Sequence, residues 1–103
     1  MENLNFGDAI KALKEGKKVA RKGWNGKGMF IFLHEGHKFY PSPLRSTHEV
    51  LTGSSLIRKI VNEREKEMDS LPFIVMKTAD NKFCPGWLAS QTDMLSEDWM
   101  IVE

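Results

Sequence analysis

The chain has 103 residues and a formal net charge of +1, with 15 Lys and Arg against 14 Asp and Glu. This length predicts one domain over residues 1–103 and leaves no room for two catalytic domains. The charge balance excludes a global field that would draw the protein onto DNA, RNA or a membrane. A single cysteine, the lack of a signal-peptide pattern and the lack of ~20 consecutive apolar residues together predict a cytoplasmic protein.

The N-terminal third predicts a helix followed by two paired strands. Asn5 and Gly16 are placed to cap the two ends of the helix. Its apolar side chains recur at helical spacing, at Phe6, Ala9, Ile10 and Leu13. Residues Lys18 to Lys22 predict a brief strand, and the alternation from Gly28 to His34 predicts a stronger one that pairs with it antiparallel. Asn25-Gly26 between them favours a tight turn with positive φ.

The middle of the chain predicts an inserted helix. Residues 38–40 are expected to continue the sheet, and Ser54 or Ser55 then caps a helix that Pro72 follows. One apolar face is expected at Leu56, Ile57, Ile60, Val61 and Met68.

The last third predicts short strands around a turn and a short helix. Phe73 to Thr78 is typical of a strand, residues 79–82 of a turn, and residues 83–84 of a further short strand. Residues 98–102 predict a closing strand. The fold class is therefore α+β, a small antiparallel sheet with an N-terminal, an inserted middle and a short C-terminal helix.

Residues with catalytic or metal-binding chemistry are few. The histidines His34, His37 and His48 have no Cys or carboxylate cluster that would complete a metal site. Cys84 lies between Phe83 and Pro85 and is expected to be a small buried hydrophobe rather than a thiolate. We expect no catalytic residue, no metal and no cofactor.

The glycine-rich run from Gly23 to Gly28 invites comparison with phosphate-binding loops. It lacks the Ser or Thr after Lys27 and the following helix that such loops need, so a plain hairpin turn is the favoured interpretation. That interpretation does not explain Trp24, a large aromatic residue expected near the exposed tip of the turn.

The segment from Trp87 to Asp93 places an aromatic side chain beside a helix start. Ser90 and Asp93 have the spacing of a cap and its reciprocal partner. The free N–H groups of the helix start, with Ser90, Gln91 and Thr92, are typical of an anion site. The alternative is that Ser90 and Asp93 only cap the helix while Trp87 fills the core.

Several stretches carry a resemblance to a known family. They are Asn5 to Val19, Arg21 to Phe30, Met76 to Asp80 and Trp87 to Trp99. Together they resemble the second type of Thoeris anti-defence protein, a family of small phage and prophage proteins. The resemblance implies an α+β homotetramer that captures cyclic nucleotide immune signals, chiefly glycocyclic ADP-ribose, without a reaction. This chain departs from the shortest members between about residues 48 and 71, where a helix replaces a loop.

A ligand of this kind offers bases, riboses and a pyrophosphate, so its site needs aromatic, polar and cationic side chains. The expected ligand-binding residues are Arg21, Trp24, Asn25, Phe30, Lys77, Thr78, Trp87, Ser90, Gln91, Thr92 and Asp93. Two other classes of function stay open. A structural or protein-binding oligomer would also explain the aromatic residues, and a small phosphodiesterase would need a metal or base that the sequence does not present.

Overall fold

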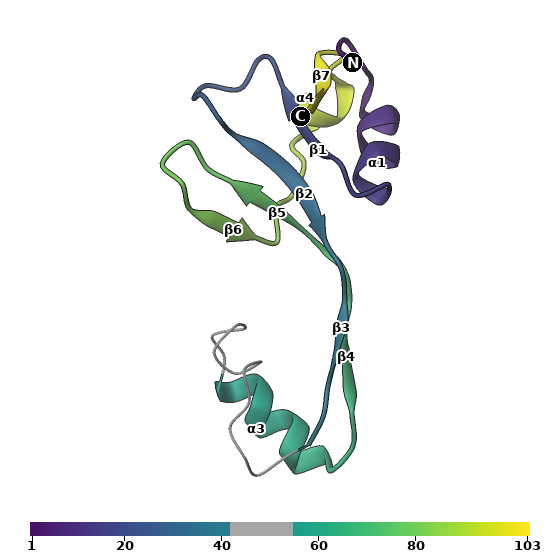
Figure 1. Ribbon diagram of the computed structural model, residues 1–103, viewed down its shortest axis with the longest axis vertical. Coiled ribbons are helices and arrows are strands. Elements are labelled where there is room, and N and C mark those ends of the chain that lie inside the picture. Colours follow the sequence, from purple (N-terminus) through teal and green to yellow (C-terminus); the bar gives the residue numbers. More distant parts are fainter. Residues whose placement is uncertain (42–54) are drawn as a thin grey trace. The chain divides into compact units, whose positions relative to one another are not determined.

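The computed structural model describes residues 1–41 and 55–103, whose contacts form two compact units (Figure 1). Unit 1 comprises Met1–Glu35 and Phe73–Glu103, and unit 2 comprises Gly36–Pro72. The secondary structure confirms the α+β class, with N-terminal, middle and C-terminal helices and antiparallel strands. That residues 1–103 form one domain stays a prediction.

Unit 1 contains a five-stranded antiparallel sheet in the order β6-β5-β2-β1-β7. The strands are β1 (Lys18–Arg21), β2 (Phe30–His34), β5 (Phe73–Lys77), β6 (Phe83–Pro85) and β7 (Trp99–Val102). Each of these five strands was predicted and is confirmed, with ends that differ by one or two residues. The N-terminal residues cover the outer edge of β7, because Leu4 and Trp99 exchange backbone hydrogen bonds and the Ile101 N–H donates to the Met1 carbonyl.

Helix α1 (Phe6–Lys14) packs against β1, β2 and β7 (Figure 1). Its predicted start is confirmed, since the Asp8 N–H donates to Asn5 Oδ1 at 2.8 Å and the Asp8 carboxylate accepts the Asn5 N–H at 3.3 Å. Gly16, at φ +86°, follows the C-cap. The largest fully buried side chains of the core are Trp99, Leu13, Ile31 and Val19, and full burial of such a side chain contributes about 1.5–3 kcal/mol.

Alternation along β2 assigns its side chains to two faces of the sheet. Ile31 is fully buried against α1, and Leu33 packs on the same core. Phe30, Phe32 and His34 therefore point to the opposite face, as the sequence predicts. The register pairs Phe30 with Lys77 and Phe32 with Val75, so these side chains of β5 share that face.

Unit 2 is a helix inserted into a two-stranded ribbon. Strand β3 (His37–Phe39) pairs antiparallel with β4 (Met68–Ser70), and α3 (Ser55–Arg64) lies between them in sequence. The prediction that residues 38–40 continue the main sheet is wrong, because this strand pairs with β4 in a separate sheet. Met68 belongs to β4 rather than to the helix. Ser54, one of the two predicted caps, lies outside the described residues, as does His48.

Candidate functional site

The short C-terminal helix α4 (Gln91–Leu95) begins with the predicted cap. The Asp93 N–H donates to Ser90 Oγ and the Ser90 N–H donates to Asp93 Oδ2, both at 3.0 Å. The reciprocal cap is therefore confirmed. These two cap bonds use backbone N–H groups of the helix start, where the sequence predicted an anion site. Gln91 and Thr92 are exposed in the first turn.

Asp93 is the centre of a buried polar network, with only 8% of its surface exposed. Its Oδ1 accepts hydrogen bonds from Arg21 Nη1 at 2.8 Å and from Trp24 Nε1 at 3.1 Å, and its carbonyl accepts the Trp99 Nε1–H at 2.9 Å. Burial by itself would raise the pKa of Asp93, but hydrogen bonds from the Ser90 N–H, Arg21 and Trp24 outweigh it and lower the pKa to about 2. Asp93 is therefore ionised at neutral pH.

Arg21 joins Asp93 to a second carboxylate, Asp98. Its Nε donates to Asp98 Oδ1 at 2.9 Å, and the other Asp98 oxygen accepts the Gly23 N–H at 2.8 Å. The hydrogen bond to Asp98, followed by that to Asp93, raises the pKa of Arg21, and the same bond from Arg21 holds the pKa of Asp98 below its ordinary value. Both carboxylates thus engage the Arg21 guanidinium, which fixes α4 and the start of the β1–β2 connection.

Three indole rings pack on this network. The centroids of Trp24 and Trp99 are 5.3 Å apart, those of Trp24 and Trp87 6.1 Å, and those of Trp87 and Trp99 6.3 Å, all edge to face. Trp24 is half-buried against the core. The expectation that it sits at an exposed tip is wrong, because β1 ends at Arg21 and β2 starts at Phe30, so residues 22–29 form a longer connection than a two-residue turn. Gly26 has the predicted positive φ, +116°.

The opposite face of the sheet carries a second cluster, which we call the phenylalanine face: Phe30, Phe32, Phe83, Lys18 and Lys77. Lys18 Nζ lies 5.1 Å from the centroid of the Phe30 ring, and Lys77 Nζ lies 5.8 Å from it. Lys77 is held there by donating to the Gly28 carbonyl at 3.0 Å. The rings of Phe30 and Phe32 are 6.1 Å apart and those of Phe32 and Phe83 5.8 Å, with Phe83 69% exposed.

Nine of the eleven residues predicted for the site fall into two groups within unit 1, and the other two lie in neighbouring loops. The contacts above join Arg21, Trp24, Trp87, Ser90 and Asp93 in one group, with Gln91 and Thr92 on the adjoining helix. Phe30 and Lys77 form the other. Asn25 is exposed in the 22–29 connection, and Thr78 bonds Asp80 and Lys82 in the β5–β6 turn. These two loops lie against each other, since Gly26 approaches Ala79.

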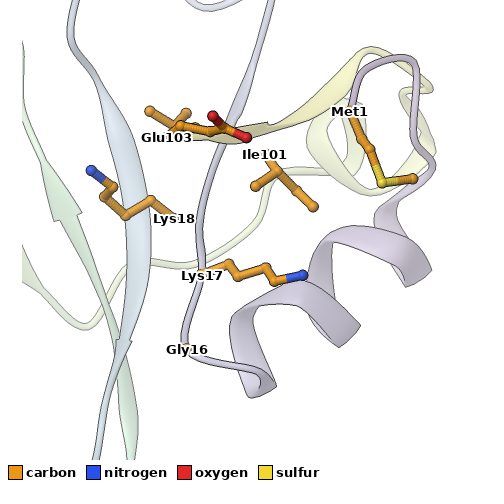
Figure 2. A pocket seen from close by; sticks show the side chains of 7 residues that line it. Met1, Gly16, Lys17, Lys18, Ile101 and Glu103 are labelled. Carbon is orange, nitrogen blue, oxygen red and sulfur yellow. The ribbon is translucent and has the colours of Figure 1, made fainter.

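An open hollow of about 400 Å³ lies beside β7 and is lined by none of the predicted residues (Figure 2). Its polar lining includes Lys17, Lys18 and Glu103. Figure 2 shows the Lys17 and Lys18 side chains extending to opposite sides of the chain. Lys18 thus connects the rim of this hollow to the Phe30 ring.

The described histidine and cysteine side chains have contacts different from those in the two clusters. His34 stacks on Phe73 with centroids 4.6 Å apart, and His37 contacts Phe39 at the same separation. Within residues 1–41 and 55–103, no three His, Cys, Asp or Glu side chains are arranged to hold a metal ion. Cys84 is exposed, so its predicted burial is wrong; β6 is an edge strand that only β5 flanks. None of the described helices is long and apolar enough to cross a membrane.

Sequence reasoning missed Asp98, Lys18, Phe32 and Phe83. Asp98 is 77 positions from Arg21, so only the pairing of β1 with β7 brings them together. Lys18 and Phe83 reach the Phe30 surface through the order of the strands. The alternation of β2 was the one available signal, because it places Phe32 on the face of Phe30.

The fold and these two clusters define a small α+β protein with a tryptophan–carboxylate network on one side of its sheet and a basic aromatic surface on the face opposite α1. The model of the Thoeris anti-defense 2-like domain matches residues 4–102. Thoeris anti-defense 2 of Bacillus phage SP01 is 38% identical over 99 residues, which cover 96% of this chain and 94% of that protein. The chain therefore belongs to the Thoeris anti-defense 2-like family, which confirms the resemblance seen in the sequence.

Proposed function

We propose that this protein is a non-catalytic sponge, which binds a nucleotide immune signal and keeps it intact. The signal is glycocyclic ADP-ribose or a cyclic di- or trinucleotide, and its capture in the cytoplasm of the host cell blocks Thoeris-type antiviral signalling. Family membership supports the anti-defence role.

One observation carries the ligand class: the ammonium groups of Lys18 and Lys77 lie 5.1 Å and 5.8 Å from the centroid of the Phe30 ring. A nucleotide presents a flat base next to negatively charged phosphates. An aromatic ring flanked by two cations matches both parts, because the base stacks and the phosphates pair with the ammonium groups. The continuation through Phe32 to exposed Phe83 extends the apolar surface beyond one base.

Two further predicted residues fit beside this assignment, since Asn25 and Thr78 supply polar groups from the two loops beside Lys77. Gln91 and Thr92 are exposed on α4, which contacts α1, so within one copy they lie away from the phenylalanine face. Arg21, Trp24, Trp87, Ser90 and Asp93 hold α4 and residues 22–29 in place. We expect the sponge to act as a homotetramer, because so small a core gains stability from assembly.

Incubation with an excess of the protein should deplete free glycocyclic ADP-ribose, and heat denaturation should return it with unchanged mass and retention time. Nanomolar capture requires about 12 kcal/mol of binding free energy, which many simultaneous contacts must supply. Chromatography with mass detection measures both steps, with a cyclic dinucleotide tested in parallel. A new product peak would identify a hydrolase instead. No depletion by either ligand would favour the protein-binding oligomer.

Phe30→Leu should weaken ligand binding by about tenfold or more, because stacking on an aromatic ring contributes roughly 1–3 kcal/mol per base. Leucine keeps most of the apolar volume, so the melting temperature should change little. Calorimetric titration measures the affinity. Lys18→Gln should also weaken binding and reduce its salt dependence, whereas Lys82→Gln, an exposed lysine paired with Asp80, is the matched control. Equal affinities for Phe30→Leu and the parent would remove the phenylalanine face from the site.

A further inference from the structure

The two lysines of the phenylalanine face differ in how their ammonium groups are held. Both groups lie near the Phe30 ring, Lys18 Nζ at 5.1 Å and Lys77 Nζ at 5.8 Å from its centroid. In the described part of the chain, the Lys77 ammonium group, but not that of Lys18, also donates a hydrogen bond, to the Gly28 carbonyl at 3.0 Å. Because a lysine side chain is a flexible stem, this second fixed point restricts Lys77 before any ligand binds.

Gly28 has a backbone conformation that favours glycine. Its φ is +78°, in the region that L side chains rarely adopt. A Cβ atom added at residue 28 would lie 3.3 Å from Lys77 Nζ, which is closer than ordinary van der Waals contact. The ammonium group ends a flexible side chain, so we expect an added Cβ to displace it from the carbonyl. The hydrogen bond from Lys77 therefore depends on a residue without a side chain at this position.

The backbone on both sides of this hydrogen bond is fixed. Strand pairing sets Lys77 opposite Phe30, and Gly28 precedes Phe30 by two residues. Earlier in the same connection, Gly26 approaches the β5–β6 turn so closely that an added Cβ would meet Ala79 Cβ at 3.0 Å. The bond thus joins two segments that already lie against each other, which gives the ammonium group one preferred position beside the ring.

We propose that Gly28 is a positioning residue of the nucleotide site and acts through the Lys77 ammonium group. This inference rests on the proposed function, since it concerns the same phenylalanine face. The Gly28 carbonyl takes one N–H donor of the ammonium group and leaves the others for a phosphate oxygen. Because the side chain is already ordered, it loses less rotamer freedom on binding than an unanchored lysine does. Gly28 thus adds affinity without contacting the ligand.

Gly28→Ala tests this role, with Gly86→Ala as the matched control. Gly86 has a similar φ of +82°, so both changes strain the backbone, but a Cβ added at residue 86 meets no heavy atom of the described residues within 4 Å. Calorimetric titration uses glycocyclic ADP-ribose and a cyclic dinucleotide. Gly28→Ala should weaken binding of whichever the parent binds by about two- to tenfold, the cost of ordering one side chain. Gly86→Ala should bind as the parent does.

A double-mutant cycle shows whether Gly28 acts through Lys77. The ammonium group is absent in a Lys77→Gln background, so Gly28→Ala should cause no further loss of affinity there. Circular dichroism verifies the fold of each variant. Gly28→Asn, whose side chain tolerates positive φ, should show the same loss and replaces Gly28→Ala if that variant does not fold. Equal losses with and without the Lys77 ammonium group would overturn the proposal.

A measurement without ligand separates this proposal from the proposed function. Ring currents change the chemical shifts of protons near an aromatic face, so NMR of the Lys77 CεH2 protons reports their position beside Phe30. Phe30→Leu gives the shift without the ring. Gly28→Ala should move the parental shift toward that value, whereas Gly86→Ala should leave it unchanged. An unchanged Lys77 shift in Gly28→Ala would overturn the positioning role, whereas a parent that binds neither nucleotide would refute the proposed function.

Discussion

Asp93→Ala is expected to lower the free energy of unfolding by about 3–5 kcal/mol, the usual cost of removing one partner of a buried ion pair. The change leaves the guanidinium of Arg21, the indole N–H of Trp24 and the N–H of Ser90 without their shared acceptor. Urea denaturation followed by tryptophan fluorescence measures the loss. In a domain of this size, such a loss lowers the melting temperature by more than about 10 °C.

Asp80→Ala is the matched control, because Asp80 is an exposed carboxylate of the β5–β6 turn. It should change stability by less than about 1 kcal/mol. An unchanged unfolding midpoint for Asp93→Ala would contradict the role assigned to the network.

Acid titration gives a second measure of the same carboxylate. The pKa of Asp93 is about 2 in the folded protein against an ordinary value of 3.8. Because this pKa is lowered on folding, the ionised Asp93 carboxylate adds about 2 kcal/mol to the free energy of unfolding. This contribution is fully present above about pH 4 and is lost as the pH falls toward 2. The parent should lose this increment over that window, whereas Asp93→Ala should show a shallower slope there.

Local signals predicted much of the fold. The Asn5 cap and the capping box of Ser90 with Asp93 were predicted from the sequence, because the donor and acceptor of such a cap belong to one turn, whereas the reciprocal bond from Asp8 to Asn5 was not predicted. Alternation likewise predicted the faces of β2. The length of the β1–β2 connection was not predictable in this way: Asn25-Gly26 suits a tight hairpin, but packing of Trp24 on Trp99 draws the chain into a longer loop.

Long-range pairing explains what the sequence did not predict. Asp98 became a partner of Arg21 only through the β1–β7 register, which pairs Arg21 with Trp99. The charge of Lys77 predicted it as a ligand-binding residue, but its position over Phe30 depends on the β2–β5 register. The separate pairing of β3 with β4 has the same origin, since apolar alternation shows that a strand forms but not which strand it joins.

Trp24→Ala is expected to lower the free energy of unfolding by about 3 kcal/mol, at the low end for a large aromatic residue because Trp24 is only half-buried. The change removes the edge contacts with Trp87 and Trp99 and leaves Asp93 without one of its donors. Thermal and urea unfolding measure the effect. Trp24→Phe keeps most of the packing and loses only the N–H donor, so it should cost about 1 kcal/mol.

The pair of variants separates support of the core from contact with a ligand base. If Trp24 acts by packing, stability falls strongly in Trp24→Ala and weakly in Trp24→Phe, and affinity for the nucleotide follows the folded fraction. If its ring instead stacks on the ligand, Trp24→Ala loses about tenfold or more in affinity while its unfolding midpoint stays near that of the parent. The position of its indole N–H on buried Asp93 favours packing, since this bond and the edge contacts with Trp87 and Trp99 hold the ring against the core.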